Sequence, residues 1–419
     1  MSYSEQVLHN LSDNNLEEAQ TNLKYAFKED DSETLSSLAE ELYAMGFTDQ
    51  SQQVYRFLIK QHPKEDIFKV FLGELLLNEN QETEGLSYLY EITEESDAYL
   101  QALLVLADYY QTEGVFEAAE QKLKEAHQID PEEPVIIFGL AELYYSMGQF
   151  QPASEYYSLL LDGGENYIAN TNIQKRLGLA LAKMGDYEEA LNELKELNDL
   201  EKDTEVNYQL GLLSLQVNDD KQAENYLMAV VDEMPDYISA YAPLAMAQQH
   251  LGKNEEALNT AQAGLSYTEF DEALYQIAGE AALYLKQFDT AQKIFEKGLA
   301  INEDSQVLKA GLSQTYLRQK SYQAEIDFLT QLDEDQLTPQ MNWDLAKAYQ
   351  ETEQFEQAKA QYLLAYRAFS TDTDFLKQML EFAQELADRE LQILLMQQYL
   401  KVNPDDLQMQ NDLDDLQNR

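Results

Sequence analysis

The 419-residue chain has no cysteine, which excludes disulfide bonds, thiolate metal sites and a cysteine nucleophile. Proline and glycine are scarce, at 8 and 16 residues, and there is a single tryptophan. Because proline and glycine interrupt helices, their scarcity favours helical structure. No window approaches the roughly 18 consecutive apolar residues of a membrane span, and the amino-terminal residues show no signal-peptide pattern. We therefore expect no membrane insertion and a cytoplasmic location.

Basic residues are also few. The chain has 28 Lys and Arg against 78 Asp and Glu, a net charge of −50. Such a field repels nucleic-acid phosphates and anionic lipid headgroups, so we expect no nucleic acid as a ligand. It attracts basic partners, although a solvated acidic surface that only prevents aggregation is the alternative interpretation.

A pair formed by leucine, or once alanine, and a following small residue recurs along the chain at an almost constant step. The step is about 34 residues, the period of several repeat architectures, and it is clearly longer only between Leu140 and Leu177. At the small residue, the backbones of neighbouring helices are expected to approach closely. The longer step indicates one insertion, near Asp162-Gly163-Gly164-Glu165. The pairs are Leu38-Ala39, Leu72-Gly73, Leu106-Ala107, Leu140-Ala141, Leu177-Gly178, Leu210-Gly211, Leu244-Ala245, Ala278-Gly279, Leu312-Ser313 and Leu345-Ala346.

A second small residue, with a bulky residue four positions later, follows between most successive pairs, for example Ala119 with Leu123 and Ala291 with Phe295. Between the two signals a glycine often marks a turn, as at Gly114 and Gly148. The spacing predicts repeated helical hairpins whose apolar faces are covered only by stacking. In one unit Glu325 stands where the second small residue belongs.

This pattern resembles the tetratricopeptide repeat (TPR), in which W-x2-L-G-x2-Y, A-x3-F and P recur with a period of about 34 residues. The resemblance covers nearly the whole chain, although the repeat tryptophan is absent throughout. It implies an all-α, right-handed α-α superhelix of about twelve hairpins, forming one solenoid over residues 1–419 with a longer loop or irregularity at 162–170 and a capping helix at 404–417. The acidic composition is similar to that of uncharacterised TPR proteins of Gram-positive bacteria.

No chemistry-bearing motif accompanies the repeats. The four histidines are widely separated along the chain, no G-x-x-x-x-G-K-[ST] or G-x-S-x-G sequence occurs, and carboxylates are so numerous that pairs arise by chance. We therefore predict no catalytic residues, no metal site, no cofactor and no enzymatic activity.

The resemblance further implies that first helices line a concave groove, with the position after the small residue facing it. This row is acidic in the amino-terminal third and apolar in the middle of the chain, so it predicts a groove of mixed character. Ordinary solvation and packing are the alternatives. The row consists of Glu40, Glu74, Asp108, Glu142, Leu179, Leu212, Met246, Glu280, Gln314 and Lys347.

Aromatic residues Phe138, Tyr208 and Trp343 form another candidate groove row, suited to anchoring a partner, although packing between units is the alternative. The basic clamp with which some TPR proteins hold a peptide carboxylate is missing, because Lys175-Arg176 is the single basic pair in these rows. We predict a scaffold that binds a protein or peptide, with a basic segment as the favoured ligand. A peptide-sensing receptor that changes curvature on binding is the second hypothesis.

Overall fold

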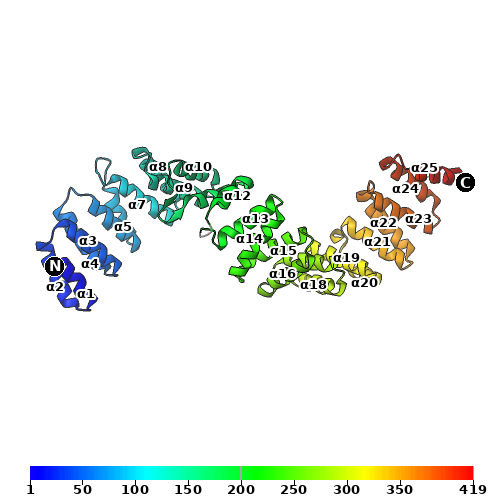
Figure 1. Cartoon of the computed structure of the whole chain (residues 1–419), viewed down its shortest axis with the longest axis horizontal. Helices are drawn as coiled ribbons and strands as arrows, with labels where there is room; N and C mark the ends of the chain where they lie inside the picture. The colour runs from blue at the N-terminus through cyan, green and yellow to red at the C-terminus, as the bar shows by residue number, and fades with distance from the viewer. Residues whose placement is uncertain (199–200, 419) are drawn as a thin grey trace. The chain divides into compact units, whose positions relative to one another are not determined.

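The computed structural model describes residues 1–198 and 201–418, and its contacts divide the chain into two compact units, residues 1–199 and 200–419. In residues 1–198 and 201–418, twenty-five α-helices form twelve successive hairpins and one additional terminal helix, six hairpins in each unit (Figure 1). The all-α prediction with about twelve hairpins is therefore confirmed. A single solenoid over the whole length stays a prediction.

The described part of the first unit contains twelve helices and two short strands. Its elements are α1 (Tyr3–Ser12), α2 (Leu16–Glu29), α3 (Ser32–Ala44), α4 (Thr48–Gln61), α5 (Ile67–Asn78), α6 (Glu82–Tyr90), α7 (Tyr99–Thr112), α8 (Phe116–Ile129), α9 (Pro134–Ser146), α10 (Phe150–Asp162), β1 (Tyr167–Ile168), β2 (Thr171–Asn172), α11 (Ile173–Met184) and α12 (Tyr187–Glu196).

Over residues 201–418, the second unit contains thirteen α-helices and two 3-10 turns. Its elements are α13 (Thr204–Gln216), α14 (Asp220–Glu233), η1 (Ile238–Ala240), α15 (Tyr241–His250), α16 (Asn254–Tyr267), α17 (Glu272–Tyr284), α18 (Phe288–Ile301), α19 (Gln306–Gln319), α20 (Tyr322–Leu329), η2 (Glu334–Gln336), α21 (Pro339–Glu351), α22 (Phe355–Phe369), α23 (Thr373–Glu385), α24 (Arg389–Val402) and α25 (Leu407–Asn418).

Every hairpin turns through one residue with left-handed backbone angles. Five of these residues are glycines, such as Gly46 at φ +82°, where the absence of a Cβ removes the steric cost. The sequence pattern identified only these five turns. The other seven use Asn14, Asn80, Asn218, Lys286, Lys320, Glu353 and Ala387.

The small residues lie where the two helices of a hairpin cross. Gly279 of α17 faces the fully buried ring of Phe295 of α18, and a Cβ on Gly279 would overlap that ring. Gly211 and Leu227 repeat the arrangement, with 2.5 Å between the position of an added Cβ and the leucine Cγ. Close packing leaves no room for a larger residue, so the recurring Ala and Gly are structural.

The insertion in the first unit forms a small antiparallel hairpin. Tyr167 pairs with Asn172 and Ile168 with Thr171, while Ala169 and Asn170 turn the chain with φ of +47° and +65°. Two successive positive φ values are typical of the tight turns that join paired strands. This hairpin leads directly into α11.

Helix α25 packs on the last hairpin, as the capping prediction requires. Met409, Leu413 and Leu416 are partly buried against the core of α21 to α24, and Arg389 of α24 donates to the carbonyl oxygen of Leu416 at 2.7 Å. Leu407, the first residue of the helix, is exposed, and Met409 lies one helical turn before Leu413 on the packed face.

One hairpin of the second unit carries a buried carboxyl group. Glu325 of α20 is fully buried where most other second helices have alanine. Ser313 of α19 donates its hydroxyl to Glu325 Oε1 at 2.5 Å, while Oε2 has no hydrogen-bond partner among the described residues. Asp344 of α21 is also buried nearby.

Candidate functional site

Three carboxylates of the predicted acidic row occupy equivalent positions on α3, α5 and α7. Glu40, Glu74 and Asp108 are all exposed. The surrounding protein partly desolvates Glu74, which raises the pKa of its carboxyl, and the charge of Asp108 raises it further. Burial raises the pKa of the nearby Tyr55 phenol, and the charges of Glu40 and Glu74 add to this effect. Glu74 therefore lies in the field of Asp108, and Glu40 and Glu74 act together on Tyr55.

No ion pair neutralises these three carboxylates within the described part of the chain. We call Glu40, Glu74 and Asp108 the acidic row. Like charges held close together favour the approach of a cation, and the charge of Asp108 acts directly on Glu74.

Glu142, the fourth predicted member, is held differently. The Arg176 guanidinium donates from Nε to Glu142 Oε1 at 2.6 Å and from a terminal nitrogen to Oε2. Tyr157 also donates its hydroxyl to Oε1 at 2.5 Å, and the Arg176 guanidinium lies 4.3 Å from the centre of the Tyr145 ring. Because Glu142 is already paired with a cation and most of its lone pairs accept hydrogen bonds, it is a poor ligand for a cationic side chain of a partner. We therefore leave Glu142 out of the acidic row, whose last member is Asp108.

The predicted apolar positions differ in exposure. Leu179 is buried, Phe138 and Leu212 are half-buried, and Met246 is 38% exposed. Tyr208 packs against another tyrosine ring at 5.1 Å between centroids. Phe138 and Leu179 belong to the first unit and the other three to the second, so each group is described within its own unit.

Trp343 packs inside the second unit. Its ring lies 5.1 Å from both Phe369 and Phe375, measured between centroids, and its indole N–H donates to Gln378 Oε1 at 3.0 Å. Lys347, one turn later on α21, is half-buried. Trp343 therefore packs between successive hairpins. This is the alternative to a groove position that the sequence analysis gives for the aromatic row.

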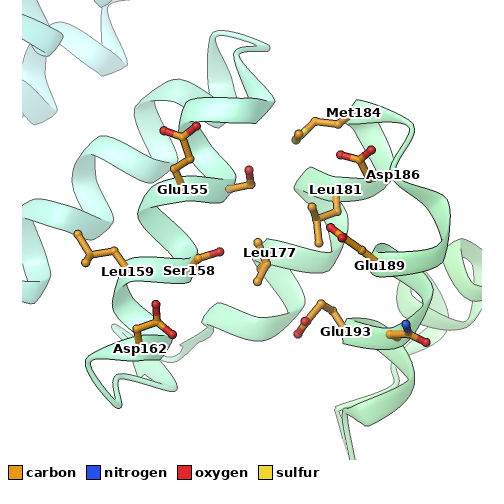
Figure 2. Close-up of a pocket in the computed structure, with 12 residues that line it drawn as sticks. Glu155, Ser158, Leu159, Asp162, Leu177, Leu181, Met184, Asp186, Glu189 and Glu193 are labelled. Carbon is orange, nitrogen blue, oxygen red and sulfur yellow. The ribbon is translucent and has the colours of Figure 1, made fainter.

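A groove of about 710 Å³ lies between α10 and α12, with α11 as its floor (Figure 2). Leu177 and Leu181 of α11 lie between two carboxylate-bearing sides. The sequence did not predict this groove, and the only signal near it is the insertion that separates α10 from α11. The carboxylates on its sides are Glu155 and Asp162 of α10, Asp186, which precedes α12, and Glu189 and Glu193 of α12.

The charges around this groove are uncompensated. Within the described residues none of its five carboxylates forms an ion pair, and no lysine or arginine lines it. Burial raises the pKa of Glu193, and the charges of Glu196 and Glu189 raise it further, against a hydrogen bond from Gln174. We call this feature the α10–α12 groove.

Among residues 1–198 and 201–418, no group of three or more His, Asp or Glu side chains is arranged to hold a metal ion. In the same part of the chain, each helix is too short or too polar to cross a bilayer.

Comparison with known families and structures gives matches to repeat proteins. The family described as "YpiA-like, C-terminal tetratricopeptide repeats" matches residues 339–406, and "YpiA-like, tetratricopeptide repeats" matches residues 111–165. General tetratricopeptide-repeat families match residues 37–99, 176–204 and 272–305.

Two solved structures of repeat proteins align with this chain. The APC/C hetero-tetramer Cut9-Hcn1 aligns over 99% of this chain and 96% of that chain, at 11% identity and a TM-score of 0.40. The C-terminal part of a TPR repeat-containing protein from Cytophaga hutchinsonii aligns over 66% and 99%, at 13% identity and a TM-score of 0.42.

A relative in sequence is the TPR repeat-containing protein YpiA of Bacillus subtilis, which is 31% identical over 347 residues, covering 82% of this chain and 81% of YpiA. Together with the twelve helical hairpins, this similarity shows that the chain belongs to the tetratricopeptide-repeat family, among its YpiA-like members.

Proposed function

We propose that the chain is a non-catalytic cytoplasmic scaffold that binds a basic segment of a partner protein through the acidic row of its first unit. Membership of a TPR family supports the coarser statement that it mediates protein–protein interaction. The basic ligand is supported by one observation: Glu40, Glu74 and Asp108 occupy equivalent exposed positions, the charge of Asp108 acts on Glu74, and no cation among the described residues pairs with any of the three.

The proposed mechanism is electrostatic. A lysine or arginine placed between two members of the row would meet two carboxylates whose mutual repulsion it relieves. Such contacts steer encounter and depend strongly on ionic strength, because the Debye length is about 10 Å at 0.1 M salt. Glu142 contributes little to this binding, because Arg176 already neutralises it.

The test uses a short fluorescein-labelled peptide of alternating lysine and serine. The triple variant Glu40→Gln, Glu74→Gln, Asp108→Asn should bind it at least about tenfold more weakly at low salt, with melting behaviour nearly unchanged because the three groups are exposed. Fluorescence anisotropy measures the affinity, and salt titration should show a smaller slope for the variant.

A matched control removes the same charge elsewhere in the unit. Glu17, Glu18 and Glu29 are exposed residues of α2, and changing all three to Gln should alter the affinity less than about twofold if location matters more than net charge. Equal weakening by both triple variants would mean that only the overall charge attracts the peptide.

A further inference from the structure

We infer that the α10–α12 groove is a second docking surface, for an amphipathic helix of a partner protein with leucine-like residues along one stripe and lysine or arginine on both sides of it. The inference goes beyond the proposed function, because the groove and the acidic row use different residues. It stands on the shape of the groove, its apolar floor and the arrangement of charge around it.

The floor supplies the apolar contact. Leu177 and Leu181 are one turn apart on α11 and line the base, where they are 7% and 8% exposed and so present only their outer edges. Met184 and the 48% exposed Leu159 line the groove as well. Leu179, the α11 residue in the predicted concave row, lies two positions from Leu177. On a helix of roughly 3.6 residues per turn this is about 200° around the axis, so the groove opens on the opposite side of α11 from that row.

The sides supply the charge. Figure 2 shows Glu155 and Asp162 on one side of the groove and Asp186, Glu189 and Glu193 on the other, with Leu177 and Leu181 between them. A helix lying over the floor would therefore meet carboxylates along both flanks. Electrostatic complementarity selects basic residues on both flanks of the ligand's apolar stripe.

The dimensions suit a short helix. Along α10 the lining residues run from Ser154 to Asp162, which at about 1.5 Å per residue corresponds to roughly 12 Å, or about two helical turns. Apolar residues at i, i+4 and i+7 of the ligand would then reach the floor, as in other helix-in-groove complexes.

The chain itself explains why this groove occurs at this place. Other first helices follow the preceding hairpin at the regular step of the repeat, whereas here the step is longer and the β1–β2 hairpin intervenes between α10 and α11. The inserted residues change how α10 leads into the next hairpin. We therefore connect the groove with the insertion.

The test uses the full-length chain and a short fluorescein-labelled helical peptide with three leucines at i, i+4 and i+7 and lysines beside them. Two control peptides have serine in place of leucine or glutamate in place of lysine. The first peptide should bind at low salt, and both controls should bind at least about tenfold more weakly, because apolar contact and charge are both required.

Two groove variants locate the binding. Asp162→Asn, Glu189→Gln, Glu193→Gln removes charge from both sides, and Ser158→Trp places an indole in the groove without changing charge. Each should weaken binding of the leucine–lysine peptide at least about tenfold. The acidic-row triple variant and the α2 triple variant should each change it less than about twofold, and circular dichroism should show that every variant keeps its helical signal.

Three results would overturn the inference. First, the α2 triple variant could weaken peptide binding as much as the triple charge variant of the groove does. The loss of affinity would then come from the lower net charge and not from the groove. Second, the serine peptide could bind as tightly as the leucine peptide, which would mean that the ligand makes no apolar contact with the floor of the groove. Ser158→Trp could also leave the affinity unchanged while its helical signal is intact. The proposal that the acidic row binds a basic segment is tested separately, with the lysine–serine peptide. Either proposal can therefore be refuted without affecting the other.

Discussion

The buried Glu325 should make the second unit less stable as pH rises through neutrality. Burial raises the pKa of its carboxyl from 4.5 to about 8, and the charge of Asp344 adds to this, while the Ser313 hydroxyl lowers it. A carboxyl whose pKa is higher in the folded than in the unfolded state binds its proton more tightly when folded. Its stabilising contribution is therefore complete below about pH 4.5 and is lost as pH rises toward about 8.

The magnitude follows from the size of this shift. Each pH unit between the two pKa values costs about 1.4 kcal/mol of unfolding free energy. At acid pH Asp344 also contributes to the pH dependence of the unfolding free energy, because its own burial raises the pKa of its carboxyl to about 6. Between pH 6 and pH 8 Glu325 dominates, and the wild type should lose on the order of 2–3 kcal/mol.

Replacing Glu325 with glutamine keeps the shape and removes the titration. Glu325→Gln should show little of this loss, and Glu325→Ala, which restores the small residue of other second helices, should be more stable than the wild type at pH 8. Urea unfolding at pH 6, 7 and 8 measures both, followed by helical circular dichroism and by the fluorescence of Trp343, which reports on the second unit alone.

The matched control is Glu303→Gln, at an exposed carboxylate of the same unit. It should retain the pH dependence of the wild type, because an exposed group contributes little. If the wild type loses no more stability between pH 6 and pH 8 than Glu325→Gln does, the buried carboxyl does not hold its proton as argued.

Three further predictions concern contacts inside the units. Arg176→Ala should reduce the unfolding free energy by roughly 1–3 kcal/mol in urea titrations because it leaves Glu142 partly buried and unpaired, and a loss below about 0.5 kcal/mol would contradict the role of this pair. Gly279→Ala should cost roughly 1–3 kcal/mol in thermal unfolding by forcing the buried Phe295 ring to move, whereas unchanged melting would refute the close contact. Trp343 should emit at short wavelength and resist acrylamide because aromatic rings pack against it, and ready quenching would show that the indole is exposed.

The sequence by itself determined the fold of each hairpin and the number of hairpins. The regular spacing of small residues is a local signal, since each Ala or Gly is required by the partner helix of its own hairpin, as Gly279 is by Phe295. The turns that lack glycine could not be predicted in this way. Lys286 and Glu353 adopt left-handed angles at φ +58° because the hairpin geometry imposes them, and their side chains give no sign of it.

Only the tertiary structure decided which predicted site residues are available to a partner. Glu142 and Asp108 occupy the same place in the repeat, yet Arg176, one repeat further along the chain than Glu142, neutralises only Glu142. The α10–α12 groove likewise depends on side chains from α10, α11 and α12, which Figure 2 shows around it. Repeat periodicity fixes the positions that face a neighbouring helix, whereas the charge and exposure of a surface residue depend on side chains contributed by other repeats.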